Sequence, residues 1–128
     1  MSMKAKELKL FFAVGIGGIL GALLRYIIAE SVSIISFPVG TTIANLMGCF
    51  VLAYVTFQPF FKNKLPPAIF TAFTTGLLGS FTTFSTFIAE SVLLFEESTA
   101  WLILYLPIQI LGGVALCFIG AKLAISKE

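Results

Sequence analysis

Four runs of apolar residues, each long enough to cross a bilayer as a helix, constrain this chain more than any other feature. They cover about residues 8–28, 41–61, 68–95 and 101–125 of a 128-residue sequence. A helix needs about 20 mostly apolar residues to cross a hydrocarbon core of roughly 30 Å. Because the runs use nearly the whole sequence, we expect an all-α membrane protein with a single four-helix domain, residues 1–128.

The composition supports lipid as the solvent. Only 11% of the residues are charged and 59% are hydrophobic, whereas soluble domains average about 25% charged residues. The first run follows a lysine-rich segment and therefore resembles a signal peptide. It is longer than the apolar part of such a peptide, and three further runs follow it, so we expect a retained helix.

The connections between the runs are short, and they predict the arrangement of the helices. Residues 31–40, 60–67 and 96–99 join them. Links of this length make consecutive helices antiparallel neighbours, which predicts a compact bundle. Gly17 and Gly21 form a G-x-x-x-G pattern in the first helix. Such residues allow close helix packing, within a chain or between chains, and do not indicate a particular function.

Basic residues are distributed very unevenly between the two ends of the predicted bundle. Seven lysines fall on the side of the N-terminus, namely Lys4, Lys6, Lys9, Lys62, Lys64, Lys122 and Lys127. The other side carries Arg25 as its single basic residue, near the outer end of the first helix. Cytoplasmic loops are enriched in Lys and Arg. We therefore expect a multi-pass protein of a bacterial cell membrane with both termini in the cytoplasm.

The residue inventory argues against an enzyme. The sequence has no His, which excludes Ser-His and Cys-His catalysis and His-based metal sites. Cys49 and Cys117 both fall inside apolar runs. We interpret them as small apolar packing residues, with a disulfide or metal role as the minor alternative.

The third run is the most polar of the four. Between residues 71 and 91 it carries many hydroxyl side chains and one acid: Thr71, Thr74, Thr75, Ser80, Thr82, Thr83, Ser85, Thr86, Glu90 and Ser91. Gly76 and Gly79 interrupt it, and glycine together with β-branched threonine lowers helix propensity. We predict a break in this helix, which lipid tolerates only where protein or a polar path covers it. The alternative is that the hydroxyls bond to carbonyls one turn earlier and hold helices together.

Asn45 and Arg25 are the other costly side chains within the apolar runs. The Asn45 amide either clamps two helices together or presents its NH2 donors to an anion. Arg25 is either an anchor at the membrane surface or a residue that draws anions toward a vestibule. Phe81, Phe84 and Phe87 recur every three residues. Such a stripe is usually packing, although ring edges carry positive partial charge that could face an anion.

These residues together resemble the Fluc family of bacterial fluoride channels. The resemblance rests on three segments, GGILGALLRY at 17–26, GTTIANLMG at 40–48 and GLLGSFTTFSTF at 76–87. Their order and spacing cover the first three helices, and the chain length and helix count also agree. The combination of G-T-x-x-x-N with T-T-F-S-T-F is the specific part of this similarity.

The resemblance implies a dimer of antiparallel subunits with two narrow pores and a function in fluoride export. Phe84 and Phe87 would turn their ring edges toward the ion, and Asn45 would donate from its amide. The polar track would include Thr82, Thr83, Ser85, Thr86 and Glu90. The carbonyls of Gly79 and Thr82 would bind a structural Na+ at the dimer centre.

The fourth run departs from the family pattern. The family places small hydroxyl residues along the pore, but residues 101–125 contain no Ser or Thr. Tyr105 is expected to match a pore tyrosine, and Gln109 stands where a hydroxyl would be. Pro107 and Gly113 follow the same face. A smaller departure is Ser80, which occupies the position of a second glycine and keeps the break.

The lysine bias adds a hypothesis about the partner. An antiparallel homodimer requires a chain that inserts in both orientations, but this chain is strongly biased toward one. We therefore expect it to pair with a paralogous, oppositely oriented chain, giving one good pore and one impaired pore. Two other functions remain open: a proton-coupled multidrug antiporter, which needs an embedded carboxylate such as Glu90, and a non-conducting membrane scaffold.

Overall fold

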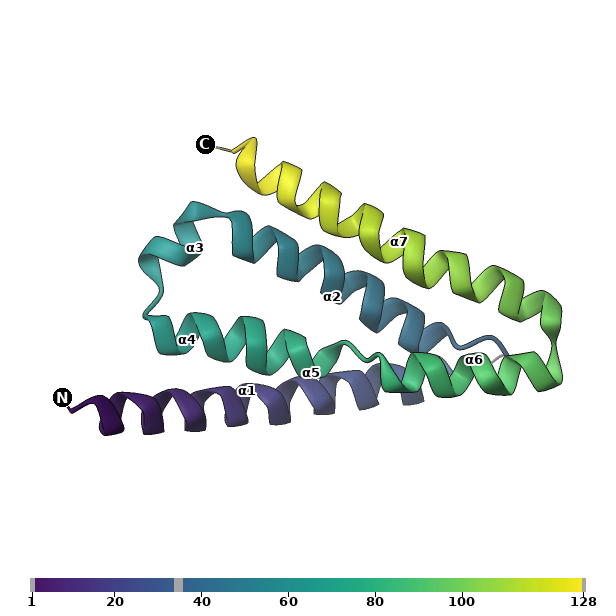
Figure 1. Cartoon of the computed structure of the whole chain (residues 1–128), viewed down its shortest axis with the longest axis horizontal. Helices are drawn as coiled ribbons and strands as arrows, with labels where there is room; N and C mark the ends of the chain where they lie inside the picture. The colour runs from purple at the N-terminus through teal and green to yellow at the C-terminus, as the bar shows by residue number, and fades with distance from the viewer. Residues whose placement is uncertain (1, 34–35, 128) are drawn as a thin grey trace.

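The protein is a bundle of four helical spans. The computed structural model describes residues 2–33 and 36–127. The first and fourth spans are the continuous helices α1 (Met3–Ser31) and α7 (Thr99–Ile125), and the second span is α2 (Val39–Phe57). All four spans, counted within the described residues, are long and apolar enough to cross a membrane. The all-α membrane architecture that the sequence predicts is confirmed, and the spans alternate in direction along the chain (Figure 1).

The second span is shorter at its C-terminal end than the predicted 41–61. Gln58 is extended and ends α2, and Pro59 begins the short helix α3 (Pro59–Lys64). Proline lacks the N–H that a continuing helix needs, but it fits the first turn of a new one. Phe60 and Phe61 therefore belong to the connection, although the apolar run of the sequence continues through them.

The third span is assembled from four pieces. They are α4 (Pro67–Thr71), a π-helical segment η1 (Ala72–Leu78), the single turn α5 (Gly79–Phe81) and α6 (Ser85–Glu97). Helical geometry stops after Phe81, because Thr82 is extended with φ −80° and ψ 156°. The interruption lies near the middle of the span and places backbone groups at membrane depth.

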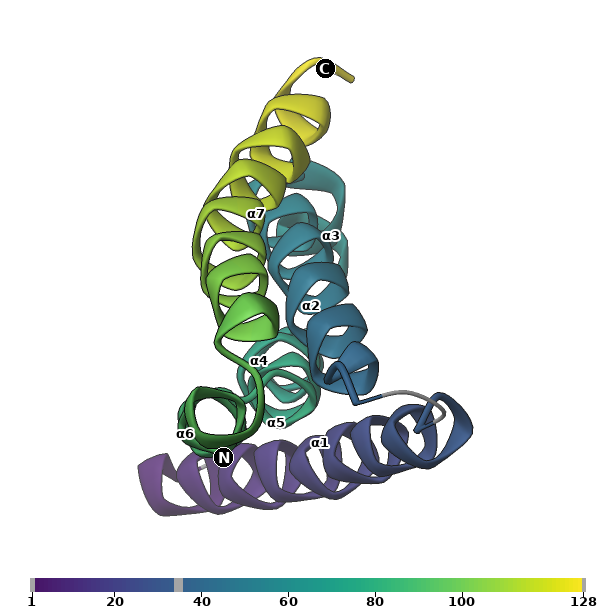
Figure 2. The same ribbon diagram turned by 90° about the vertical axis from the view of Figure 1, so that its right-hand side faces the viewer.

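The four spans pack as two pairs. The main neighbour of α1 is the first half of the third span, and the main neighbour of α2 is α7 (Figure 2). A Cβ on Gly17 would overlap the carbonyl of Ala72, and one on Gly21 would overlap that of Leu77. The G-x-x-x-G pattern therefore packs α1 against the third span of the same chain.

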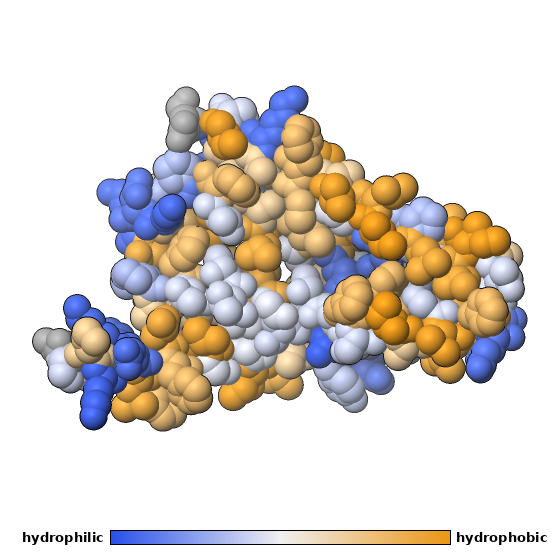
Figure 3. All heavy atoms as spheres, in the orientation of Figure 1, coloured by the Kyte–Doolittle hydropathy of each residue, from blue (hydrophilic) through white to orange (hydrophobic). Residues whose placement is uncertain are grey.

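On the face drawn in Figure 3, hydrophilic residues gather mainly at the two ends, and the surface between them is a mixture of hydrophobic residues and residues of intermediate hydropathy, with a smaller hydrophilic patch among them. The start of α1, helix α3 and the end of α7 lie at one end of the bundle (Figure 1). These segments carry the seven lysines. The structure therefore brings the seven lysines together at the end where both termini lie.

Candidate ion pathway

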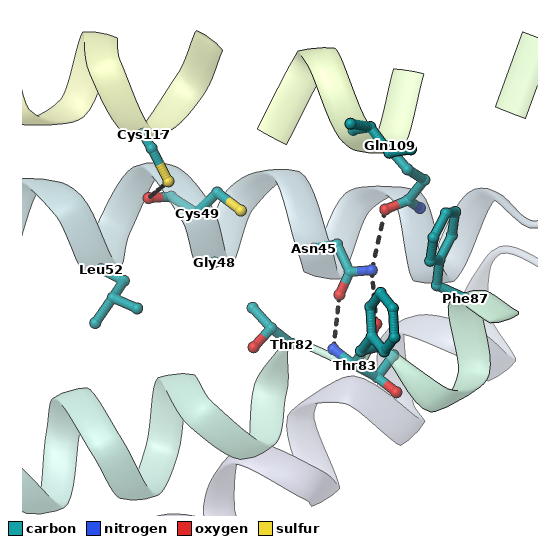
Figure 4. Close-up of a pocket in the computed structure, with 11 residues that line it drawn as sticks. Asn45, Gly48, Cys49, Leu52, Thr82, Thr83, Phe87, Gln109 and Cys117 are labelled. Carbon is teal, nitrogen blue, oxygen red and sulfur yellow. Dashed lines mark hydrogen bonds between the residues drawn. The ribbon is translucent and has the colours of Figure 1, made fainter. Parts of the chain in front are cut away.

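Asn45 holds the interruption of the third span. Its Oδ1 accepts the Thr83 N–H at 2.7 Å, and its Nδ2 donates to the Thr83 carbonyl at 2.9 Å (Figure 4). Asn45 thus replaces, for one residue, both hydrogen bonds that a helix would provide. An unsatisfied backbone group in lipid costs several kcal/mol. The clamp is what makes a non-helical residue tolerable at this depth.

The second N–H of the Asn45 amide bonds to a residue of α7. Nδ2 also donates to Gln109 Oε1 at 3.0 Å (Figure 4), and Gln109 Nε2 donates to Thr42 Oγ1 at 3.4 Å. Gln109 is 8% exposed. The two amides therefore connect the backbone of the interrupted span to α2 and α7.

A carboxylate forms the next group of polar contacts along α7, and we refer to these contacts together with those of Asn45 and Gln109 as the track. Glu90 on α6 accepts from Thr41 at 2.8 Å and from Tyr105 at 2.7 Å, one bond on each carboxylate oxygen. Tyr105 is fully buried and lies one helical turn before Gln109 on α7. Asn45, Gln109, Tyr105 and Glu90 thus follow one another along the interface of α2, α6 and α7.

Six hydroxyls of the third span fall into two groups. Those of Thr74, Thr82 and Ser91 donate to carbonyls one turn earlier, at 2.7–3.0 Å. Those of Thr83 and Thr86 bond to each other at 3.0 Å, and Ser85 Oγ lies 3.5 Å from Thr83 Oγ1. The hydroxyls of the first group make their hydrogen bonds to backbone carbonyls of their own span. The second forms a hydroxyl cluster at the start of α6.

Phe84 and Phe87 lie in different surroundings. Phe84 is 75% exposed on the surface of the single chain, whereas Phe87 is 7% exposed and packs with Leu94 and Tyr105. Their ring centroids are 5.9 Å apart with an interplanar angle of 49°. Both rings lie beside the hydroxyl cluster, but only Phe84 projects from the chain.

Arg25 makes a contact that neither sequence hypothesis included. Its Nε donates to the Ser80 carbonyl at 3.1 Å, and the side chain is half-buried. Ser80 is in the last turn before the interruption, so its carbonyl lacks the helical partner four residues on. Arg25 therefore caps the helix end and lies away from the chain of bonds around Asn45.

Two further carbonyls lose their helical partners at the interruption. A continuous helix would give the Thr83 N–H to Gly79 and the Thr86 N–H to Thr82. Instead, Thr83 donates to Asn45 and Thr86 donates to the Thr83 hydroxyl at 3.2 Å. Gly79 is exposed on the chain surface. The donor set at this position consists of carbonyl oxygens, which suit a hard cation.

A hollow of about 360 Å3 lies between α2, α7 and the interruption. Its polar lining includes Asn45, Thr82, Thr83 and Gln109, and Phe84 and Phe87 also line it (Figure 4). Cys49 and Cys117 line the opposite part, where Cys117 Sγ donates to the Cys49 carbonyl at 3.5 Å. Both cysteines are free, and the Cys117 thiol bonds to neighbouring backbone, in keeping with a packing role.

Thr41 and Thr42 belong to the track, but sequence analysis assigned neither a role, although Thr41 is the T of the G-T-x-x-x-N motif. They precede Asn45 by four and three residues, which places all three side chains on one face of α2. That spacing is the signal that could have identified them. Among the predicted site residues, Arg25 is separate from the track, and the Thr82 hydroxyl is engaged within its own helix.

Comparisons with known proteins agree on one family. Residues 12–121 match the family described as CrcB-like protein, Camphor Resistance (CrcB). The chain is 43% identical over 130 residues to the fluoride-specific ion channel FluC 1 of Bacillus cereus strain ATCC 14579, covering 96% of this chain and 90% of that protein. It is 45% identical over 111 residues to FluC 1 of Staphylococcus aureus strain NCTC 8325, covering 84% and 90%.

Proposed function

Since the chain belongs to the CrcB-like family, we propose that it is a subunit of a fluoride-selective ion channel that lets fluoride leave the cell. The names of its relatives support this function. The observation that carries it within the chain is two polar contacts on successive turns of α7, that of Asn45 with Gln109 and that of Glu90 with Tyr105. Neither the family nor the track suggests an enzyme.

The chemistry of the track suits a small, strongly hydrated anion. A bare charge at the centre of a bilayer costs on the order of tens of kcal/mol by the Born estimate. Amide N–H groups, hydroxyls and ring edges replace the lost water without a fixed cation that would trap the ion. The Asn45 amide, the Thr83, Ser85 and Thr86 hydroxyls and the edges of Phe84 and Phe87 would supply these contacts.

Tyr105 and Glu90 would form the continuation of the route. The Tyr105 hydroxyl donates to Glu90, and the same carboxylate accepts from Thr41. An approaching anion could accept a hydrogen bond from either hydroxyl in place of Glu90, so that the hydroxyl would keep a partner throughout. Exchange between bonds of similar strength keeps binding adequate but not tight, as conduction requires.

A structural Na+ fits the interruption of the third span. The carbonyls of Gly79 and Thr82 have lost their helical amides to side chains, and both remain able to bind a cation. The lone pairs of these oxygens would coordinate the ion, which would hold the interruption in place. Because Gly79 is exposed in the single chain, a second subunit could complete the coordination.

The second subunit would be antiparallel and different in sequence. The seven lysines at one end of the bundle favour insertion with both termini in the cytoplasm of a bacterial cell. A paralogous chain of opposite orientation would then complete the dimer. A reporter fused to the C-terminus should be cytoplasmic in essentially all molecules. An even split between the two sides would contradict this pairing.

Neither alternative function is supported by the relatives. An antiporter needs a carboxylate free to exchange a proton and a cation, whereas both Glu90 oxygens accept hydrogen bonds from hydroxyls. A scaffold would not need the exposed Phe84 beside the hydroxyl cluster.

Fluoride efflux from liposomes tests the proposed function. The purified protein, alone and with an oppositely oriented relative, should release fluoride rapidly and chloride negligibly. Phe84→Leu should slow fluoride by roughly tenfold, the factor that corresponds to about 1.4 kcal/mol of lost aromatic interaction. Phe95→Leu is the matched control, because Phe95 lies on α6, the helix that Phe84 caps, and is 66% exposed. Absence of fluoride release in both preparations would contradict the proposal.

A further inference from the structure

Gln109 is the residue whose role the track does not explain. It is buried on α7, one turn after Tyr105. The family resemblance implies a small hydroxyl at this position, and a hydroxyl can both donate and accept. A glutamine instead has separate ends, an oxygen that only accepts and an NH2 that only donates. Which end faces Asn45 decides what Gln109 does to an anion.

The neighbours determine the orientation of the Gln109 amide. Asn45 accepts the Thr83 N–H with its Oδ1, so its NH2 must face α7. The Thr42 hydroxyl gives its hydrogen to the Pro38 carbonyl at 2.8 Å, so it offers only lone pairs. The reverse orientation of Gln109 would place two NH2 groups together. Oε1 therefore faces Asn45, and Nε2 faces Thr42.

Both N–H groups of Asn45 are consequently engaged. One binds the Thr83 carbonyl, which has no helical substitute and would be stranded in the membrane without it. The other binds Gln109 Oε1, which belongs to a side chain with rotatable bonds. The bond to Gln109 is therefore the one that an incoming anion can replace.

We propose that Gln109 limits fluoride binding in this chain by competing with the ion for the second N–H of Asn45. The inference rests on the proposed fluoride channel function. Fluoride reaches Asn45 only when Gln109 Oε1 withdraws, and the negative end of that carbonyl opposes the anion until it does. Gln109 thus lowers the fluoride affinity of the track, whereas a hydroxyl at this position could rotate to donate to the ion.

Selective labelling makes this competition measurable. Asn45 and Asn63 are the two asparagines of the sequence, so protein labelled with 15N at asparagine gives two side-chain NH2 signals in detergent. Asn63 is exposed in α3 and serves as the internal reference. In wild-type protein, added fluoride should shift the Asn45 signal and leave the Asn63 signal unchanged.

The decisive variant is Gln109→Met, which keeps the length of the side chain and removes its oxygen. Without fluoride, the Asn45 NH2 signal should move upfield as its hydrogen bond is lost. With fluoride, the midpoint of the titration should fall by roughly tenfold, as expected when one ordinary hydrogen bond stops competing. Gln58→Met is the matched control, because Gln58 joins α2 to α3 away from the track, and its midpoint should equal that of wild type.

Two outcomes would overturn the proposal. One is a midpoint in Gln109→Met that is equal to or higher than that of wild type. The other is a fluoride-independent Asn45 signal in both proteins, which would remove the ion from this site. Fluoride efflux from liposomes of the same preparations separates the causes: release without an Asn45 shift refutes only the role of Gln109, whereas no release with or without the partner refutes the channel function.

Discussion

The interface between α2 and α7 has two halves that are built in different ways. In the half nearer the start of α2, side chains meet through hydrogen bonds, with Asn45 and Gln109 at the centre. In the half nearer its end, small residues bring the two backbones together. A Cβ on Gly120 would lie 2.5 Å from the Phe50 carbonyl, and Cys117 donates to the Cys49 carbonyl.

The two halves differ in whether their contacts between helices can be replaced by contacts with an ion. Hydrogen bonds between side chains can be replaced by bonds to an ion of similar strength, so the first half can open a polar route without losing its partners. Close backbone packing offers nothing to an anion, and any added atom forces the helices apart. One helix pair thus combines a replaceable polar contact with a rigid apolar one.

The largest effect is expected at Asn45, which carries the polar half. Asn45→Ala strands the N–H and carbonyl of Thr83 at membrane depth. The free energy of unfolding in detergent should fall by about 3 kcal/mol, because each buried backbone group left unpaired costs about 1–3 kcal/mol. Asn63→Ala, on an exposed position, should stay within about 0.5 kcal/mol of wild type. Equal losses in the two variants would show that the clamp does not hold the interruption.

The apolar half is tested by adding a single methyl group. Gly120→Ala places its Cβ against the Phe50 carbonyl, and overpacking of this kind costs about 1–3 kcal/mol. Gly112→Ala on the same helix is the matched control, since its nearest neighbour is the flexible Leu46 side chain at 3.2 Å. Thermal unfolding in detergent should separate the two variants clearly. If Gly120→Ala were as stable as Gly112→Ala, close backbone packing would not define this half.

The smallest effect tests whether the apolar half can be made polar. Gly113 is one turn after Gln109, and a Cβ there would make an ordinary contact with Cys49 Sγ at 3.5 Å. Gly113→Ser therefore adds a hydroxyl without a clash. Fluoride efflux should rise by about threefold, the factor for a gain of roughly 0.6 kcal/mol, at the weak end for one hydrogen bond. Gly113→Ala should leave efflux unchanged, and an equal rise in both variants would indicate a packing effect.

Much of the fold could be predicted from the sequence because lipid imposes a strict length on each span. The apolar runs predict the four spans, and the glycines and threonines from Gly76 onward predict where the third one is weak. The sequence places the end of α2 at residue 61, whereas the helix ends at Phe57. The prediction was too long because apolar residues continue through Pro59 into the connection. Hydrophobicity alone does not distinguish an interfacial segment from a span.

The candidate site was predictable in its residue types but not in its bonds. Asn45, Glu90, Tyr105 and Gln109 stand out as polar groups in apolar runs. Their partners depend on which helices are neighbours, and this is a matter of tertiary packing. For the same reason, the contact of Arg25 with Ser80, 55 residues away, could not be derived from local sequence.

The most direct test of the account is fluoride efflux from liposomes carrying Asn45→Asp, compared with Asn63→Asp. The carboxylate can still accept the Thr83 N–H, so the interruption keeps one bond of its clamp, but the NH2 donors are gone. The account predicts that Asn45→Asp loses fluoride efflux while Asn63→Asp retains the wild-type rate. Wild-type efflux in Asn45→Asp would contradict it, because the ion would then cross without the donor that organises the track.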